Sequence, residues 1–271
     1  MAEIKIIDER KADHRKDISQ RPAFSLISEN RLRYLSGLKG LNLIYLEKDY
    51  FLTALLYLLR DVSGLCFKGG TALNKIFLNH TRLSEDLDFV ARENASKIKS
   101  RITEILNKGN KIFPKYEFEN QTKDFFRMKI FYQSFFTATS FIILDVNGKA
   151  SIIIEPEKKK VPHFYEEIPG FEILTLHIKE LVAEKVRSLI MRNQPRDYFD
   201  IYMLLEKGYK IDFRLAERKL REANQSLDKE RIFKNAQKVY SRWDDMKQLT
   251  NQPAEFMEVI KKLQKEFGYK S

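Results

Sequence analysis

The pattern of apolar and polar positions along the chain predicts two regions with different secondary structure. Between residues 46 and 175, apolar runs of strand length alternate with longer runs of helical spacing. The helices expected in this region are 46–60, a segment that ends at Phe77, and 95–106, and the expected strands are 65–68, 86–90, 116–120, 125–132 and 139–146. The first region is therefore predicted to have a mixed α and β structure.

From Ile178 onward the strand pattern disappears and helical spacing continues to the end of the chain. The helices expected here are 178–192, 197–206, 213–224, 228–242 and 254–267. Because no flexible linker or repeat marks a domain boundary, we place the boundary where the periodicity changes. We predict one domain over residues 1–175 and a helical-bundle domain over residues 176–271.

Composition narrows the classes of protein and of site. The chain has 271 residues with 43% hydrophobic and 32% charged positions, which is typical of a folded globular protein. A single cysteine excludes a disulfide framework and a multi-cysteine zinc site, and four scattered histidines do not favour a histidine metal site. Any metal is therefore expected on carboxylates.

Charge and hydropathy indicate where the protein acts and what it binds. The N-terminus lacks a signal-peptide pattern, and the longest uncharged run, residues 130–144, is too short and polar to span a bilayer. A cytoplasmic protein without a membrane partner is expected. The net charge of +11 favours a polyanion such as nucleic acid, although the same excess also serves solubility.

A double glycine between a strand and a helix is the first feature that points to chemistry. The stretch Phe67-Lys68-Gly69-Gly70-Thr71-Ala72-Leu73-Asn74-Lys75 lets backbone N–H groups approach a phosphate without obstruction by side chains. The N-terminus of the helix adds positive potential, and Thr71 can cap it or donate a hydrogen bond. A double glycine alone is more often an ordinary turn.

Two aspartates follow after a short interval. Asp86 and Asp88 are two residues apart, so on a strand both side chains project from one face and can share divalent cations. An isolated pair of this kind is more often a solvated strand face. A phosphate-binding turn and an acid pair within twenty residues together match the requirements of metal-dependent nucleotidyl or phosphoryl transfer.

In this combination the sequence resembles the AbiEii/AbiGii-type toxin nucleotidyltransferases, within the minimal-nucleotidyltransferase branch of the DNA polymerase β-like superfamily. The resemblance covers roughly residues 45–205. It is carried by four segments: Leu46-Glu47-Lys48-Asp49-Tyr50, the double-glycine stretch, Arg82-Leu83-Ser84-Glu85-Asp86-Leu87-Asp88, and Glu184-Lys185 followed by Arg196-Asp197-Tyr198-Phe199-Asp200. It implies a nucleotidyltransferase fold with a small mixed sheet.

The resemblance also implies a site in which Lys68, Gly69, Gly70 and Thr71 hold the triphosphate of an NTP. Asp86, Asp88 and a third acid on a later strand would bind Mg²⁺ or Mn²⁺. Asp145 is the candidate for the third acid, because Ile142, Leu144 and Val146 share the opposite face of its strand. The alternative is that Asp145 only opens the turn at Asn147-Gly148.

The helical region supplies three further candidates. Lys185 lies on the apolar arc of its helix, where it can reach a phosphate or extend its ammonium to solvent. Asp197 and Asp200 lie on the arc of the next helix that contains Ile201 and Leu204. We expect Asp200 to orient a cationic side chain, and Asp197 to cap its helix or to join the site.

Three residues near the double glycine and the acid pair complete the nucleotide-binding set. Arg82 and Ser84 precede the acid pair and can meet nucleotide phosphates, although Arg82 can equally form a surface ion pair. Lys75 lies one turn beyond Thr71, where it either binds nucleotide or, with a slight preference, is exposed to solvent.

The resemblance implies an enzyme that transfers NMP from an NTP to an RNA hydroxyl such as a tRNA 3′ end. It also implies a toxin with a separately encoded antitoxin. The alternatives are transfer of a nucleotide or a phosphate to a protein, and a nucleotide- and RNA-binding module without turnover. Asp86, Asp88, Asp145 and Lys185 are the predicted catalytic residues.

Overall fold

A mixed β-sheet is the centre of the first region in the computed structural model, which describes residues 24–108, 112–138, 140–234 and 236–269. The described strands form one seven-stranded sheet in the order β3-β4-β5-β2-β1-β7-β6. Their bounds are β1 Leu65–Lys68, β2 Asp86–Ala91, β3 Lys115–Gln121, β4 Phe125–Tyr132, β5 Ser140–Asn147, β6 Glu157–Lys160 and β7 Glu172–Thr175. The predicted fold class is confirmed.

The central strand β2 connects the two halves of the sheet. It pairs with β1 in an antiparallel and with β5 in a parallel arrangement, with Asp88 opposite Lys68 on one side and opposite Asp145 on the other. β1 is parallel to β7, and the β3–β4, β4–β5 and β6–β7 pairs are antiparallel. The acid pair therefore lies in the middle of the sheet.

The alternating burial of side chains along β4 and β5 shows which face of these strands is buried and which is less buried. Along β4 every second side chain is buried, from Phe126 to Tyr132, and along β5 the buried residues are Ile142, Leu144 and Val146. Asp145 therefore lies on the less buried face, together with Arg127 of β4, which is its direct register partner. These two side chains and the acids of β2 share one face of the sheet.

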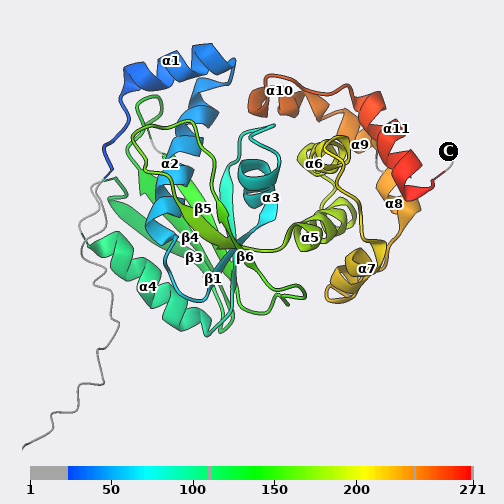
Figure 1. The fold of residues 1–271 in the computed structure, drawn as a ribbon, viewed down its shortest axis with the longest axis horizontal. Helices are drawn as coiled ribbons and strands as arrows, with labels where there is room; N and C mark the ends of the chain where they lie inside the picture. The colour runs from blue at the N-terminus through cyan, green and yellow to red at the C-terminus, as the bar shows by residue number, and fades with distance from the viewer. Residues whose placement is uncertain (1–23, 109–111, 139, 235, 270–271) are drawn as a thin grey trace, which may run out of the picture.

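Three helices from the N-terminal part of the chain lie beside the sheet, as Figure 1 shows. They are α1 Glu29–Lys39, α2 Leu43–Leu59 and α4 Ala95–Asn107. α2 is buried along most of its length, as its apolar sequence predicts. α1 was not expected, because Leu32 and Leu35 are its only buried residues and its apolar pattern is weak. Its ends are nevertheless specified by Ser28, which accepts a hydrogen bond from the N–H of Arg31, and by Gly40 in the left-handed conformation.

The helix after the double glycine changes its winding. α3 Gly69–Ala72 continues into a π-helical segment, Leu73–Phe77, so that the predicted helix to Phe77 is present with a wider second half. The strands β6 and β7 were not predicted, since each has four residues and β6 is mostly lysine at the edge of the sheet. Edge strands of this kind carry little hydrophobic alternation.

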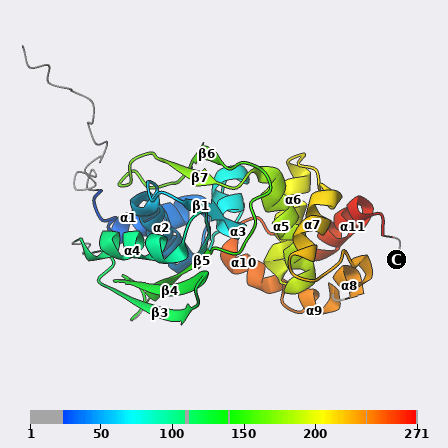
Figure 2. The same cartoon turned by 90° about the horizontal axis from the view of Figure 1, so that it is seen from below.

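After β7 the described elements are all helical, and they gather on the far side of α3 from α2 and α4 (Figure 1, Figure 2). Their bounds are α5 Ile178–Met191, α6 Pro195–Glu206, α7 Phe213–Arg221, α8 Lys229–Lys234, α9 Ala236–Tyr240, the 3₁₀ turn Trp243–Asp245, α10 Met246–Leu249 and α11 Phe256–Phe267. The division into two domains after residue 175 stays a prediction.

The helix expected over 228–242 corresponds to α8 and α9, which lie on either side of residue 235, a position outside the described residues. The chain then turns to bury Trp243 and Met246. The indole N–H of Trp243 donates to the carbonyl of Ala254, which fixes the turn. In the part of the chain that the structure describes, no helix is long and apolar enough to cross a membrane.

Candidate active site

The double glycine brings the backbone against the acid pair. Gly69 has φ +79°, which favours glycine, and a Cβ at this position would overlap the carboxylate of Asp88. A Cβ on Gly70 would lie 2.9 Å from Nη2 of Arg82 and 3.5 Å from Nζ of Lys185. Side chains at either position would therefore fill the space between the turn, the acids and the cations.

The surroundings of Asp88 disfavour the ionised form of its carboxylate. Burial raises the pKa of Asp88 to about 7, the nearby charges of Asp86 and Asp145 add to the rise, and Lys68 partly opposes it. No hydrogen-bond donor to the Asp88 carboxylate is found among the described residues, whereas Asp86 lies 3.8 Å from the guanidinium of Arg196. Negative charge therefore accumulates at Asp88 without a matching cation.

Asp145 lies beside Asp88 on the neighbouring strand, but a basic side chain engages it. Arg127 donates from Nε and Nη2 to the two carboxylate oxygens of Asp145, each at 2.7 Å. This bidentate pair raises the pKa of Arg127 further above its ordinary range. Asp145 is thus in the predicted place and is neutralised by Arg127 in this structure.

A divalent cation fits the acid pair more directly than it fits all three acids. Carboxylate oxygens are the ligands that Mg²⁺ and Mn²⁺ prefer, and a cation would offset the burial and the neighbouring acids that raise the pKa of Asp88. Within the described residues no three acidic, histidine or cysteine side chains form a complete metal-binding group. Asp86 and Asp88 can hold the ion, and Asp145 can join them once its bond to Arg127 is exchanged.

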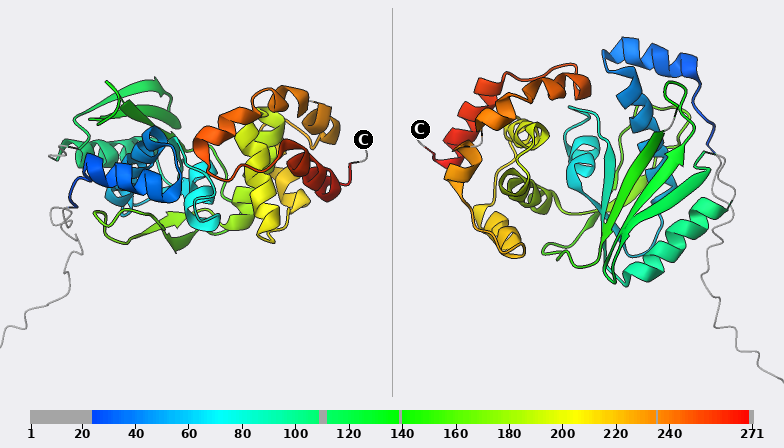
Figure 3. Two further views of the ribbon diagram at one scale, coloured as in Figure 1. Left: turned by 90° about the horizontal axis from the view of Figure 1, so that it is seen from above. Right: turned by 180° about the vertical axis from the view of Figure 1, so that it is seen from behind.

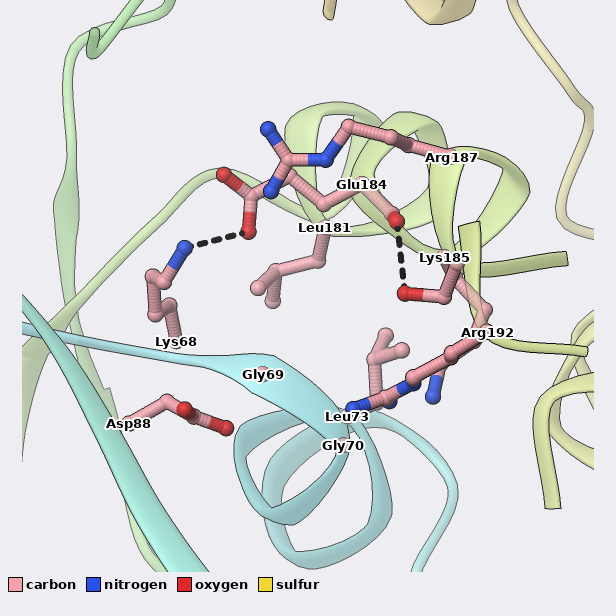
Figure 4. Close-up of a pocket in the computed structure, with 11 residues that line it drawn as sticks. Lys68, Gly69, Gly70, Leu73, Asp88, Leu181, Glu184, Lys185, Arg187 and Arg192 are labelled. Carbon is pink, nitrogen blue, oxygen red and sulfur yellow. Dashed lines mark hydrogen bonds and ion pairs between the residues drawn. The ribbon is translucent and has the colours of Figure 1, made fainter. Parts of the chain in front are cut away.

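A pocket lies between the double-glycine turn and helix α5 (Figure 4). The sheet contributes Lys68 and Asp88, the turn contributes Gly69 and Gly70, and α3 continues with Leu73. The side chains from α5 and its C-terminal end are spaced along one face: Leu181, Glu184, Lys185, Ser188 and Arg192, with Arg187 beside them. Four basic side chains against two acids make this pocket suited to a polyphosphate.

Lys185 is held at the pocket by two buried carboxylates. Its Nζ lies 2.8 Å from Oδ2 of Asp200 and 3.1 Å from Oδ1 of Asp197, and the side chain is almost fully buried. Burial alone would raise the pKa of Asp200, but the charges of Arg82 and Lys185 lower it well below its usual range. The ammonium therefore has a fixed direction toward these two carboxylates.

Asp197 both caps α6 and takes part in this cluster. Its carboxylate accepts a hydrogen bond from the backbone N–H of Gln194, which completes a capping box at the helix N-terminus. The same carboxylate accepts from Arg192 at 3.0 and 3.1 Å and from Lys185. The two roles considered from the sequence are thus combined in one side chain.

Three predicted ligands lie beneath the pocket instead of lining it. Arg82 is buried and makes a bidentate pair with Asp200, with both N–O distances 2.8 Å. Thr71 is buried and donates its hydroxyl to the backbone carbonyl of Asp86 at 2.6 Å. The hydroxyl of Ser84 is buried and has no hydrogen-bond partner in the described structure.

Lys75 differs most from its expectation. It is fully buried, so the expected solvent exposure is wrong, and its ammonium lies 2.7 Å from Asp49 and 2.9 Å from the hydroxyl of Thr53. Tyr165 donates to the other oxygen of Asp49 at 2.9 Å. Lys75 lies in the π-helical segment and reaches Asp49 of α2, and it is absent from the pocket lining.

Sequence reasoning missed three pocket residues of α5 and its end: Arg187, Ser188 and Arg192. A signal was present, because Leu181, Lys185, Ser188 and Arg192 follow the spacing of one helix face. This spacing was overlooked because the orientation of Lys185 was inferred only from the apolar residues of its helix. The missed residues add two of the four positive charges of the pocket.

Comparison with known families finds one matching model. The model described as "Nucleotidyl transferase AbiEii toxin, Type IV TA system" matches residues 50–262. The match includes both glycines, the three acids and the helices α5 and α6. No curated protein sequence matches the chain significantly.

Solved structures with similar folds are toxins and nucleotidyltransferases. MenT4, a nucleotidyltransferase toxin from Mycobacterium tuberculosis, aligns with a TM-score of 0.68 and 19% identity, over 89% of this chain and 89% of that chain. JHP933 from Helicobacter pylori aligns with a TM-score of 0.55 and 19% identity, over 82% and 90% of the two chains. A putative nucleotidyltransferase from H. pylori gives a TM-score of 0.54 and 18% identity, over 81% and 91%. At these identities the likeness concerns the fold.

Proposed function

We propose that this chain, which belongs to the AbiEii family of nucleotidyl transferase toxins of type IV toxin–antitoxin systems, transfers NMP from an NTP to an RNA hydroxyl. Membership makes the chain a nucleotidyltransferase toxin, with an NTP as substrate and an antitoxin as partner. The divalent metal, the RNA acceptor and the residue roles belong to the proposal. The observation that carries it is the pocket that joins the double-glycine turn, Asp88 and Lys185.

The basic side of the pocket is suited to the β- and γ-phosphates. The N–H groups after Gly69 open α3, and the absence of side chains at Gly69 and Gly70 leaves room for phosphate oxygens. Lys185 of α5 and Arg192 at its C-terminal end approach this turn, and Arg187 lines the pocket beside Glu184 (Figure 4). Their charge stabilises the pyrophosphate as it leaves.

The acidic side positions the reacting phosphorus. Asp86 and Asp88 would hold Mg²⁺ or Mn²⁺, which when bound would neutralise the triphosphate and polarise the α-phosphate. Lys68 and Asp88 are direct register partners, so the acid pair lies next to the start of the phosphate turn. Asp145 is near enough in the sheet to orient an attacking hydroxyl.

The proposed step is an in-line displacement. The hydroxyl oxygen of the acceptor forms a bond to the α-phosphorus, the bond from that phosphorus to the α,β-bridging oxygen breaks, and pyrophosphate leaves with the electron pair. The hydroxyl proton passes to a neighbouring carboxylate, for which Asp145 is the candidate. Preorganisation of Lys185 by Asp197 and Asp200 lowers the cost of stabilising the departing charge.

An RNA acceptor is supported by the charge of the chain. The net charge is +11, and residues 178–271 hold 21 Lys and Arg against 15 Asp and Glu. A polyanion is attracted to such a surface by release of counterions. We propose a tRNA 3′ end as the acceptor, a cytoplasmic site of action and a separately encoded antitoxin.

Transfer of labelled phosphate tests this function. The protein is incubated with total tRNA, with a mixture of cellular proteins, or with both, and with each NTP labelled at the α or at the γ phosphate. We expect label from the α position on tRNA when Mg²⁺ is present, and none from the γ position or after chelation. Label on protein, or transfer of the γ-phosphate, would contradict the proposal.

Substitution of the acid pair separates catalysis from binding alone. Asp86→Asn and Asp88→Asn should each lower transfer by at least about 100-fold, since each removes a carboxylate that would hold the divalent cation. Retained growth toxicity with intact RNA binding would instead indicate a binding module without turnover.

A further inference from the structure

A second cavity lies next to the acid pair and outside the nucleotide pocket. Its walls come from the start of α2, from the residue before β2, from the N-terminus of α6 and from the segment that leads into α10. The polar and aromatic side chains that line it are Tyr45, Glu85, Gln194, Arg196, Arg242, Asp245 and Gln248. The roles assigned above leave this cavity without a ligand.

The cavity reaches the acid pair through Arg196. The guanidinium of Arg196 lies 3.3 Å from Glu85 and 3.8 Å from Oδ2 of Asp86. The nucleotide pocket instead includes Asp88, and it lacks both Asp86 and Arg196. The two cavities therefore approach the acid pair at different carboxylates.

The sheet order indicates which cavity lies on which side. β2 lies between β1, which carries Lys68 of the nucleotide pocket, and β5, which carries Asp145. Figure 2 and the left view of Figure 3 both show α10, whose residues line the second cavity, toward the β5 side of the sheet, with β7 and β6 on the other side. The second cavity therefore lies toward Asp145, the candidate proton acceptor.

The charges of the two cavities differ in a way that assigns their ligands. The nucleotide pocket has four basic side chains and two acidic ones, which favours a triphosphate. In the second cavity Arg196 and Arg242 are matched by Glu85 and Asp245, and Arg242 lies 3.5 Å from Asp245. A cavity with balanced charge is suited to a group that carries little phosphate.

We propose that the second cavity binds the terminal nucleoside of the RNA acceptor and presents its hydroxyl to the acid pair. In-line displacement requires the attacking oxygen and the leaving pyrophosphate to lie on opposite sides of the α-phosphorus. The half-buried ring of Tyr45 provides a surface for a base to stack on, and the amides of Gln194 and Gln248 can bond to base edges. Arg196 and Arg242 contact only the phosphate that joins this nucleoside to the rest of the strand.

This inference rests on the proposed function, and its test separates the two. The variants are Tyr45→Leu, Tyr45→Phe and Arg242→Gln, with Tyr34→Leu as the control, because Tyr34 is 58% exposed on α1 and away from the cavity. Transfer from an α-labelled NTP to total tRNA gives KM for each substrate. Fluorescence anisotropy of a labelled tRNA, without NTP, gives its dissociation constant.

Loss of the Tyr45 ring should raise both the KM and the dissociation constant for tRNA about tenfold, and leave the KM for NTP unchanged. Tyr45→Phe keeps the ring and should resemble the wild type, as should Tyr34→Leu. Arg242→Gln is at an exposed position where folding is not at risk, and should raise the KM for tRNA about threefold.

Two results would overturn the inference. A higher KM for NTP with an unchanged KM for tRNA would place the base of the NTP in the cavity, and unchanged constants for both Tyr45→Leu and Arg242→Gln would leave the cavity without a substrate. Absence of transfer by the wild-type protein would refute the proposed function instead.

Discussion

The contact between Gly69 and Asp88 explains why these residue types occur at these two positions. The left-handed backbone of Gly69 and the lack of a Cβ let the turn approach the carboxylate, while burial and two neighbouring acids raise the pKa of Asp88 to about 7. The folded state therefore carries an electrostatic cost at this position. Such costs are typical of sites that are completed by a ligand.

The cost at Asp88 makes stability depend on pH in a defined direction. Between about pH 4 and pH 7 folded Asp88 keeps a proton that the unfolded chain has released, so the free energy of unfolding falls as pH rises and the cost is fully present above pH 7. Asp88→Asn removes this cost. Urea unfolding in EDTA should show the variant about 1–2 kcal/mol more stable than wild type at pH 8, with the gain absent at pH 4.

Glu155→Gln is the control for this comparison, since Glu155 is an exposed acid whose side chain is 78% accessible. It should leave the pH dependence as in the wild type. A gain for Asp88→Asn that was equal at the two pH values would show that Asp88 is not the titrating group.

Single residues also show where sequence reasoning ended. The positions of Asp86, Asp88 and Lys185 followed from the period of a strand and of a helix. The structure places the side chains of Asp88 and Lys185 at the turn, and that of Asp86 3.8 Å from Arg196. The partners of Lys75 and Arg82 could not be predicted, because Asp49 and Asp200 are distant in the chain and only the tertiary fold brings them close. A buried lysine and an exposed lysine can occur in the same local sequence pattern, so the burial of Lys75 could not be predicted from its neighbours in the sequence.

Lys75 stabilises the fold in this account, through its buried pair with Asp49. Burial alone would raise the pKa of Asp49, but Lys75 lowers it below its ordinary value. Lys75→Met leaves this acid buried without a cation and should lower the free energy of unfolding at pH 7 by about 3–5 kcal/mol in urea. Lys158→Met, at an exposed position of β6, should cost less than about 0.5 kcal/mol.

The double variant Lys75→Met with Asp49→Leu should recover part of the lost stability, because it removes both charges. A loss below about 1 kcal/mol for Lys75→Met alone would contradict the structural role of this lysine.

At the scale of elements, the pairing of β4 with β5 determines the surroundings of Asp145, the candidate third acid. The alternating burial of both strands was readable from the sequence, and so was the exposed side of Asp145. The register of the two strands, which places Arg127 directly opposite Asp145, could not be predicted from the sequence, because a one-residue shift in pairing would give Asp145 a different neighbour. Helix α1, with its weak apolar pattern, and the short strands β6 and β7 could not be predicted for a similar reason, since tertiary contacts define them.

The Arg127–Asp145 pair gives a prediction about metal affinity. Arg127→Gln removes the counter-charge of Asp145, so the three acids present one more unit of uncompensated negative charge. Affinity for Mn²⁺, measured by electron paramagnetic resonance without nucleotide, should rise about fivefold, corresponding to about 1 kcal/mol at this separation. Asp145→Asn should lower the affinity.

Arg92→Gln provides the matched control, because Arg92, which directly follows β2, makes an exposed pair with Glu155. Its Mn²⁺ affinity should equal that of the wild type. If Arg127→Gln also leaves the affinity unchanged, Asp145 takes no part in binding the ion.

At the scale of the whole molecule, buried ion pairs join the sheet region to the helices. Asp200 of α6 accepts hydrogen bonds from Arg82 and Asn74, and Glu184 of α5 pairs with Lys68 at 3.0 Å. Lys219 of α7 lies 2.5 Å from Glu180, which also accepts backbone N–H groups of the segment after β5. The same contacts that position the site therefore couple the two parts of the chain.

Loss of Asp200 should weaken the molecule as well as the site. Asp200→Asn leaves two buried cations without a full counter-charge and should cost about 3–5 kcal/mol in urea unfolding at pH 7. The loss should shrink as pH falls below about 4, because the lowered pKa of Asp200 stabilises the folded state only above the pKa of the unfolded chain. Glu206→Gln, on the same helix with an exposed Lys262 partner, should cost below about 1 kcal/mol.

The order of elements and the match of residues 50–262 to a toxin family support one central claim, that the acid pair and the double-glycine turn bind a metal–triphosphate together. A crystal structure of the protein with Mn²⁺ and an NTP analogue that has a non-cleavable α,β linkage tests it most directly. We predict anomalous density for Mn²⁺ in direct contact with the carboxylates of Asp86 and Asp88, and phosphate oxygens at the backbone N–H groups that follow Gly69. Density for the ion or the triphosphate at any other place in the molecule would contradict the claim.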